Sequence, residues 1–294
     1  MTSPFESSVV VVVGKRQARA RGGWLNEWAE FARASPTAEV LLVHGNLTGM
    51  PDEGGNLRLV AGDEGATIPQ LRLRGLQAAS ASRVILTEGF GRPAPGLLAG
   101  HCALEGRGPI DPASGSVMRA SGGASHWALT MVEYGRLLER ETGEVQLPPL
   151  VNASFNRQAL LALLEEHSAE LIQPQLQATL LMAGEAFRST GSVLIDDNRL
   201  PLREACRDLY HQGRLVGGQR MKDKGLPLRL LWMLGATLVP AVLGWRIIRA
   251  TAAAGLLGQF LRSFVQVKLM LLAIGVGEGM GALSGPGKSG ERWS

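Results

Sequence analysis

The chain has 294 residues, of which 45% are hydrophobic, and a formal net charge of +4 at pH 7. This length suits one sizeable domain with an additional segment, and the apolar fraction is sufficient for a buried core. The sequence has no dense Lys/Arg block with interleaved aromatic residues, which is the usual signature of nucleic-acid binding. We therefore expect no nucleic-acid partner. Cys102 and Cys206 lack metal-ligand spacing, so we expect reduced thiols in a cytoplasmic domain.

The first half of the chain alternates between strand and helix patterns. Residues 8–13 form an apolar, β-branched run typical of a strand covered on both faces, and the run is too short for the apolar core of a signal peptide. Alternation of strands and helices predicts a parallel sheet with right-handed crossovers. The elements expected here are strands at residues 8–13, 39–43, 57–60 and 83–86, and helices at residues 24–32 and 68–79.

The second half has weaker patterns. Gly184 follows a helical segment and is expected to terminate it. A Gly-rich connection is expected at residues 106–108 and 115–123, and an extended segment at residues 146–156. The remaining elements expected are short strands at residues 101–104 and 193–195, and helices at residues 125–138, 157–166, 175–183 and 202–210.

The composition becomes strongly apolar near the C-terminus. Residues 226–248 are long enough to cross a hydrocarbon core of about 30 Å, and residues 264–276 form a second apolar stretch. A spanning hairpin would place Arg246, Arg249 and Arg262 on the non-cytoplasmic side, against the positive-inside bias. Helices lying in the cytoplasmic face of a membrane avoid this conflict, and a soluble helical bundle is the alternative. We therefore expect an N-terminal domain at residues 1–220, a membrane-associated helical region at residues 226–283 and a flexible tail at residues 284–294.

Three short motifs have the residue types of a ligand site or a catalytic site. Glu88 stands where a strand ends before a Gly/Pro loop, the position at which open α/β sheets bind ligands, although a solvated strand end has the same pattern. Gly287-Lys288-Ser289 lacks the first Gly of a phosphate-binding loop. His44-Gly45 has the form of an α/β-hydrolase oxyanion turn. That fold also requires a nucleophile elbow, which the segment around Ser125 does not provide.

Five stretches, taken in order, resemble the family 2 glycosyltransferases, whose nucleotide-sugar-binding domain has the GT-A fold. They are Glu39-Val-Leu-Leu-Val43, Arg72-Leu-Arg-Gly75 with Ala78, VILTEGFGRPAPGL at residues 84–97, NASFNRQAL at residues 152–160, and HQGRLVGGQR at residues 211–220 with the apolar helices that follow. The resemblance implies a GT-A-like, mostly parallel sheet flanked by helices, together with C-terminal apolar membrane-associated helices.

The resemblance also assigns roles to residues. The Asp that holds the nucleotide base is replaced by His44, the metal motif retains only Glu88, and the catalytic Asp position falls on Gln173. Glu170, one helical turn earlier, is then the candidate general base. Mg²⁺ or Mn²⁺ would rest on Glu88, while Arg74 and Arg92 are candidates for neutralising the diphosphate without a metal. The residues assigned to the donor side are His44, Arg72, Arg74 and Gly75, and those assigned to the acceptor side are Asn152, Arg157, His211 and Arg214.

The function that the resemblance implies is transfer of a sugar from a nucleotide-sugar donor to a lipid-linked or envelope-polysaccharide acceptor. The enzyme would work at the cytoplasmic face of the membrane. The loss of the usual acids leaves a second interpretation open, in which the protein is an inactive relative that acts as a binding or scaffolding subunit beside a partner protein.

Overall fold

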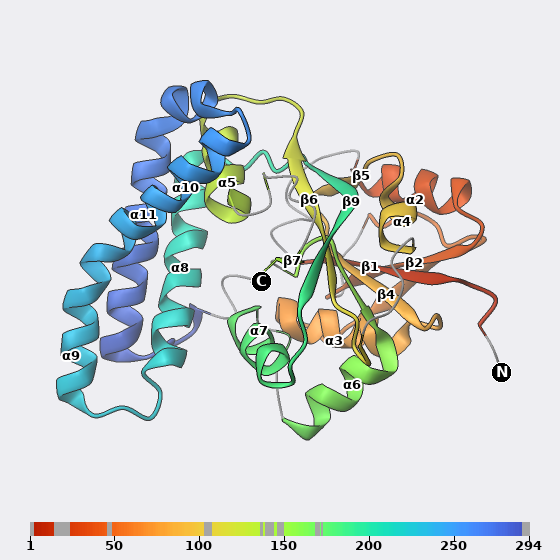
Figure 1. Ribbon diagram of the computed structural model, residues 1–294, viewed down its shortest axis with the longest axis horizontal. Helices are drawn as coiled ribbons and strands as arrows, with labels where there is room; N and C mark the ends of the chain where they lie inside the picture. Colours follow the sequence, from red (N-terminus) through yellow and green to blue (C-terminus); the bar gives the residue numbers. More distant parts are fainter. Residues whose placement is uncertain are drawn as a thin grey trace. The chain divides into compact units, whose positions relative to one another are not determined.

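The computed structural model describes residues 3–14, 24–45, 49–102, 108–135, 138, 144–145, 150–167, 171 and 173–289. The chain divides into two compact units (Figure 1). The first unit consists of Met1–Met118 and Arg140–Asp197, and the second of Arg119–Glu139 and Asn198–Ser294. The second unit thus includes residues 198–220, which we expected in the N-terminal domain.

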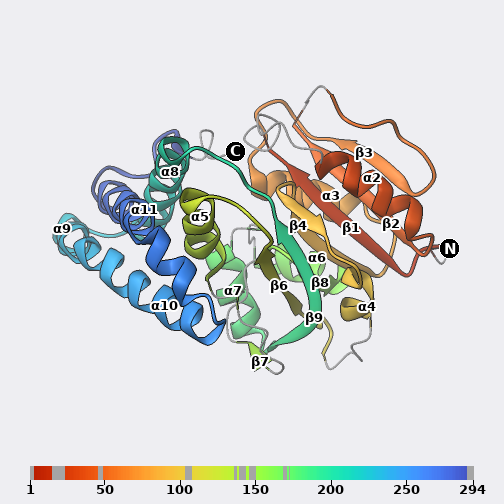
Figure 2. The same ribbon diagram turned by 90° about the horizontal axis from the view of Figure 1, so that it is seen from above.

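The first unit begins with the predicted parallel sheet. Strands β1 (Ser7–Val13), β2 (Ala38–His44), β3 (Leu57–Ala61) and β4 (Arg83–Glu88) pair in the order β3-β2-β1-β4, all parallel (Figure 2). Every residue of β1 is buried, as expected for a β-branched strand in the middle of a parallel sheet. The sequence pattern therefore predicts this half of the sheet correctly.

Helices cover both faces of these strands. Helix α2 (Trp24–Ala34) lies on one face and α3 (Ile68–Ala78) on the other (Figure 1). At Gly75 in α3, a Cβ atom would lie only 2.3 Å from Cγ1 of Val10 and 2.8 Å from Cγ2 of Val43. The absence of a side chain at residue 75 lets the helix approach the sheet closely.

The rest of the sheet is antiparallel and contains the main errors of the sequence-based assignment. The strand expected at residues 101–104 is wrong at residues 101–102, which belong to a helix in which His101 is buried; residues 103–104 lie outside the described residues. Residues 115–119 were expected in a Gly-rich connection but belong to a largely buried strand. Gly and Ser residues in this strand hide the apolar pattern by which strands are predicted. Two further elements are longer than expected, one at residues 187–196 and one at residues 202–220. The additional elements of this unit are β5 (Gly91–Pro93), α4 (Leu97–Cys102), β6 (Ala113–Arg119), β7 (Glu144–Val145), β8 (Ala153–Asn156), α6 (Arg157–Glu166), α7 (Gln173–Met182) and β9 (Phe187–Asp196).

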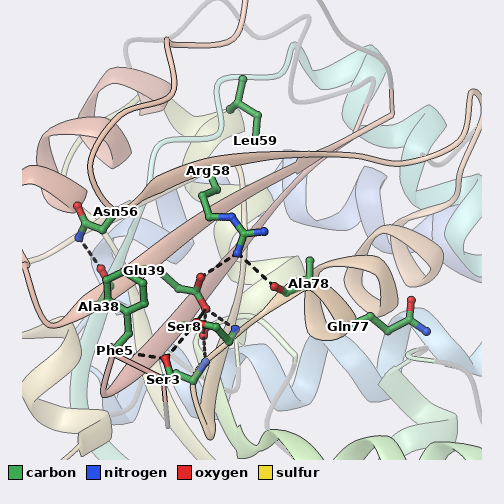
Figure 3. A network of polar contacts seen from close by, with 12 residues as sticks. Ser3, Phe5, Ser8, Ala38, Glu39, Asn56, Arg58, Leu59, Gln77 and Ala78 are labelled. Atoms are coloured by element: carbon green, nitrogen blue, oxygen red, sulfur yellow. Dashed lines mark hydrogen bonds and ion pairs between the residues drawn. The ribbon is translucent and has the colours of Figure 1, made fainter. Parts of the chain in front are cut away.

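A buried carboxylate ties together the amino-terminal ends of the parallel strands (Figure 3). Glu39 accepts hydrogen bonds from the hydroxyls of Ser8 at 2.6 Å and Ser80 at 2.7 Å, and it pairs with Arg58 at 3.2 Å. Burial alone would raise the pKa of the Glu39 carboxyl, but these hydrogen bonds together hold the pKa below its usual value. Glu39 is therefore a structural anion at the edge opposite the strand exits.

The second unit is helical. It contains α5 (Ala124–Tyr134), α8 (Leu202–Arg220), α9 (Leu226–Gly235), a short 3₁₀ turn η2 (Ala236–Leu238), α10 (Val239–Ala253) and α11 (Leu257–Ser284). Helices α8 and α11 meet backbone to backbone, since a Cβ at Gly217 would lie 2.1 Å from the carbonyl oxygen of Glu278, and one at Gly281 would lie 2.1 Å from that of Arg214. Glycines on both helices permit this close packing.

The outer face of α9, α10 and α11 is apolar and exposed. Leu226–Ala253 and Leu257–Ser284 are each 28 residues long, with mean hydropathies of 1.7 and 1.6, and so are long and apolar enough to cross a membrane by length and composition. Only 6% of the most apolar window of the first stretch is buried, unlike the core helix of a soluble protein. We use the term apolar surface for the large side chains here that are 61–65% exposed, namely Leu226, Leu231, Leu234, Leu238, Trp245, Leu261 and Val265.

Candidate functional site

His44 and Glu88 end strands β2 and β4, which lie on either side of β1 at the same edge of the sheet. His44 pairs with Val13 of β1 and Glu88 pairs with Val12, so the two side chains point to opposite faces of the sheet. Adjacent strands lie about 4.8 Å apart, which places the two strand ends about 10 Å from each other. This edge is the position at which open α/β sheets bind ligands.

Glu88 does not stand alone at this edge. Its carboxylate forms an ion pair with Nη2 of Arg72, while Nη1 of Arg72 donates to the carbonyl oxygen of Leu171 at 3.0 Å. The Arg72 side chain is 5% exposed and that of Glu88 is 18% exposed. The sequence placed both residues in the site, but it gave no sign that they pair, because they lie on different elements, α3 and β4.

The residues that follow Glu88 cannot add metal ligands from their side chains. Gly89 donates its backbone N–H to the Val12 carbonyl at 2.8 Å and packs against Trp24, and Phe90 is 3% exposed. Among the residues that the structure describes, no group of three His, Cys, Asp or Glu side chains is arranged to hold a metal ion. Mg²⁺ is bound through octahedral oxygen ligands, so one carboxylate already paired with a guanidinium does not fit such a cation.

His44 is partly buried where β2 ends. Burial lowers the pKa of its imidazole, so the ring is neutral at pH 7. Its carbonyl accepts from the N–H of Gly62 at 2.8 Å, which closes the turn after β3. A neutral imidazole at this position can both donate and accept hydrogen bonds, as recognition of a polar ring requires.

The other residues considered for the donor, which are Arg74, Gly75 and Arg92, have different surroundings. Arg74 lies on the exposed side of α3, and Gly75 faces the sheet. Arg92 binds Glu27 at 3.0 Å and lies 3.9 Å from Asp197. Arg72 is thus the cation considered for the donor that contacts Glu88.

Asn152 lies in the core of the first unit. It has a positive φ of 58° and no exposed surface, and its Nδ2 donates to the Ser116 carbonyl at 2.9 Å. Its Oδ1 is 2.8 Å from Nε2 of His101, whose Nδ1 is 3.0 Å from the hydroxyl of Ser154. Asn152, expected on the acceptor side, is therefore part of a buried polar network.

His101 in this network was missed as a buried residue by sequence reasoning. Complete burial lowers the pKa of His101 to about 4, the hydrogen bond to Asn152 opposes this shift, and the nearby Arg83 adds to it. The ring is neutral, with its proton on Nε2 facing the Asn152 oxygen. The local sequence, Gly100-His101-Cys102, contains no specific signal that would predict the burial of His101.

Arg157 caps a helix. Its Nε donates to the Leu76 carbonyl at 2.9 Å and its Nη2 to the Gln77 carbonyl at 2.8 Å, both in the last turn of α3. A guanidinium at this position satisfies free carbonyls and complements the helix dipole. The structure thus gives Arg157 a stabilising role in the first unit.

His211 and Arg214 belong to the second unit and contact the segment after α11. Nδ1 of His211 is 3.2 Å from the hydroxyl of Ser289, and Nε of Arg214 donates to the Gly285 carbonyl at 3.2 Å. Residues 285–289, expected as part of a flexible tail, are thereby packed on α8. The remaining candidate, Glu170, lies outside the described residues.

Comparisons with known proteins identify the fold. No protein-family model matches the chain, and no curated protein matches its sequence. The structure resembles the mannosyltransferase PcManGT from Pyrobaculum calidifontis, solved in complex with GDP-Man and Mn²⁺, with 16% identity over 94% of this chain and 89% of that chain and a TM-score of 0.54. It is also similar to residues 1–349 of TarS from S. aureus, solved in complex with UDP-GlcNAc, with 14% identity, 90% coverage of each chain and a TM-score of 0.44. The fold is that of the GT-A-like glycosyltransferases, which confirms the fold predicted from the motifs.

Proposed function

We propose that this protein transfers a glycosyl unit from a nucleotide-sugar to an acceptor hydroxyl. The observation that carries the proposal is the GT-A-like fold, which matches that of PcManGT over 94% of this chain. In the reaction, the acceptor oxygen forms a bond to the anomeric carbon and the bond to the nucleoside diphosphate breaks. The acceptor proton passes to a general base, and the diphosphate leaves with the bonding electrons.

The donor would bind at the edge where β1, β2 and β4 end. His44 is neutral and half-buried there, which suits a hydrogen bond to a nucleotide base. The resemblance places the catalytic Asp on Gln173, which cannot accept a proton usefully at neutral pH, so the general base is proposed to be Glu170, one helical turn earlier. PcManGT was solved with Mn²⁺, but in this chain the Glu88 carboxylate is already engaged by Arg72, and no metal-binding group of three His, Cys, Asp or Glu is present among the described residues.

The acceptor is proposed to be lipid-linked or an envelope polysaccharide, with the protein on the cytoplasmic face of a membrane. The apolar surface supports this, since many large apolar side chains are exposed on α9, α10 and α11, as at a membrane or partner contact. Arg246, Arg249 and Arg262 are exposed on the same helices, where they can meet anionic lipid headgroups. We retain the in-plane arrangement of these helices because a spanning hairpin conflicts with the positions of these arginines.

A second candidate is a non-catalytic relative that binds a partner protein. One observation favours this candidate: three residues expected in the site already have partners inside the first unit. Glu88 is paired with Arg72, Asn152 with His101, and Arg157 with the Leu76 carbonyl. The fold would then persist without turnover.

Turnover separates the two candidates. The detergent-purified protein is incubated with UDP-, GDP- and TDP-sugars and an extract that contains either membrane lipids or envelope polysaccharide, and release of the nucleoside diphosphate is measured. A transferase releases the diphosphate only when one of these extracts is present, and Glu170→Gln abolishes the release. The control Glu166→Gln, which removes the same charge from the exposed end of α6, leaves the rate unchanged. Absence of release with every donor, in a protein that is folded, contradicts the proposal and supports the binding subunit.

A further inference from the structure

The chemistry where β4 ends differs from that of a divalent-cation site. A metal there would need several oxygen ligands, yet Glu88 is followed by Gly89 and by Phe90, whose side chain is buried. Glu88 is therefore the one carboxylate among residues 88–90, and it already contacts a cation.

The guanidinium of Arg72 depends on that carboxylate. Arg72 is 5% exposed, and apart from Glu88 its hydrogen-bond partner in the described part of the chain is the Leu171 carbonyl. A buried cation without a counter-ion is costly, so Glu88 is held in place as the counter-ion of Arg72. A divalent cation bound to Glu88 would lie next to the guanidinium and be repelled by it.

We propose that Arg72 takes the place of the divalent cation in this protein, and that Glu88 is its counter-ion rather than a metal ligand. This inference rests on the proposed function, because the ligand it addresses is the diphosphate of a nucleotide donor. Nη2 of Arg72 contacts the Glu88 carboxylate, so a diphosphate bound at this strand end would lie beside that nitrogen. Phosphate oxygens and a carboxylate are the same kind of acceptor for a guanidinium, and arginine binds both.

The inference gives Glu88 and Arg72 opposite effects on donor binding. If Glu88 ligated a metal, Glu88→Gln would abolish metal-dependent binding. If Glu88 is a counter-ion, the same isosteric change removes a negative charge from beside the diphosphate, so the affinity is retained or increases. Loss of Arg72 removes charge-assisted hydrogen bonds worth about 1.5–3 kcal/mol, which corresponds to a fall in affinity of about tenfold or more.

The experiment is calorimetric titration of the full chain in detergent with UDP, GDP and their sugar conjugates, each with EDTA and with Mn²⁺. The proteins are the wild type, Glu88→Gln, Arg72→Gln, Arg72→Lys and the control Arg33→Gln, which removes a positive charge from the exposed end of α2. We expect equal affinities with EDTA and Mn²⁺, retained or tighter binding in Glu88→Gln, weaker binding in Arg72→Gln, partial rescue in Arg72→Lys and no change in Arg33→Gln.

Electron paramagnetic resonance of added Mn²⁺ tests the metal separately from the nucleotide. Protein-bound Mn²⁺ that disappears in Glu88→Gln overturns the inference whether or not a nucleotide binds. Nucleotide binding that requires Mn²⁺ also overturns it while supporting the proposed function. If neither Mn²⁺ nor any nucleotide binds, the result contradicts the proposed function, and the inference that rests on it is contradicted as well. Should Arg72→Gln or Glu88→Gln fail to fold, the comparison of EDTA with Mn²⁺ in the wild type still decides, because it needs no variant.

Discussion

The buried imidazole of His101 should make the stability of this protein depend on pH in a defined window. The pKa of His101 is lowered from 6.5 to about 4 in the folded chain, mainly by burial. The unfolded chain therefore binds a proton on this residue at a pH where the folded chain does not. The contribution of His101 to the free energy of unfolding is fully present above pH 6.5 and is lost as the pH falls from 6.5 toward 4.

The size of the effect follows from the shift. At 1.36 kcal/mol per pKa unit, the full difference is worth about 3 kcal/mol, and about 2 kcal/mol of it is lost between pH 7 and pH 5. Glu39 acts in a lower window, because its pKa lies below the usual 4.5 and its contribution is lost only as the pH falls below that value. Between pH 7 and pH 5, the change in stability due to His101 is therefore separated from the change due to Glu39.

The assay is denaturant unfolding of the detergent-solubilised chain at pH 7, 6 and 5, followed by tryptophan fluorescence. Trp28 is fully buried and its indole N–H binds the Gly91 carbonyl at 2.8 Å, so its emission reports on the first unit. The comparison is with His101→Gln, which keeps a donor for Asn152 but does not titrate.

We expect the variant to be less stable at pH 7 and to lose about 2 kcal/mol less than the wild type on going to pH 5. The neutral imidazole of His44 also resists protonation, but it is present in both proteins and cancels. Equal losses in the two proteins would refute the argument that His101 is held neutral by burial.

Three further changes test the packing and the surface. In Gly75→Ala the new methyl would lie 2.3 Å from Val10 Cγ1, and overpacking should cost about 1–3 kcal/mol, measured as a lower midpoint of thermal unfolding; an unchanged midpoint would contradict the close approach of α3. Arg157→Gln removes the hydrogen bond to the Leu76 carbonyl and should cost about 1 kcal/mol in the same assay, whereas no loss would mean that the cap contributes nothing. Trp245→Ser, at a side chain 62% exposed, should weaken flotation with anionic vesicles and leave the unfolding midpoint unchanged, whereas undiminished flotation would exclude Trp245 from the membrane contact.

The sequence alone determined the elements whose patterns are local. The strands at residues 8–13 and 39–43 each contain a continuous run of Val or Leu after a polar first residue, which suffices to predict the parallel half of the sheet. The helix at residues 157–166 begins at its predicted position, because Asn156 caps it by accepting from the N–H of Ala159 at 3.1 Å. The apolar C-terminal stretches were also evident from hydropathy, and five motifs in order were enough to predict the fold.

Only the tertiary structure decided the chemistry of the candidate site. Arg72 contacts the carbonyl of a residue 99 positions away, and Asn152 reaches His101 across 51 positions. No periodicity or motif encodes such pairs, because they arise when separate elements pack together. Burial then sets the consequences: it makes His101 a neutral structural residue and gives Glu88 a cationic partner before any ligand arrives. Residue types can be predicted locally, but their charge and their availability to a ligand depend on what the fold brings beside them.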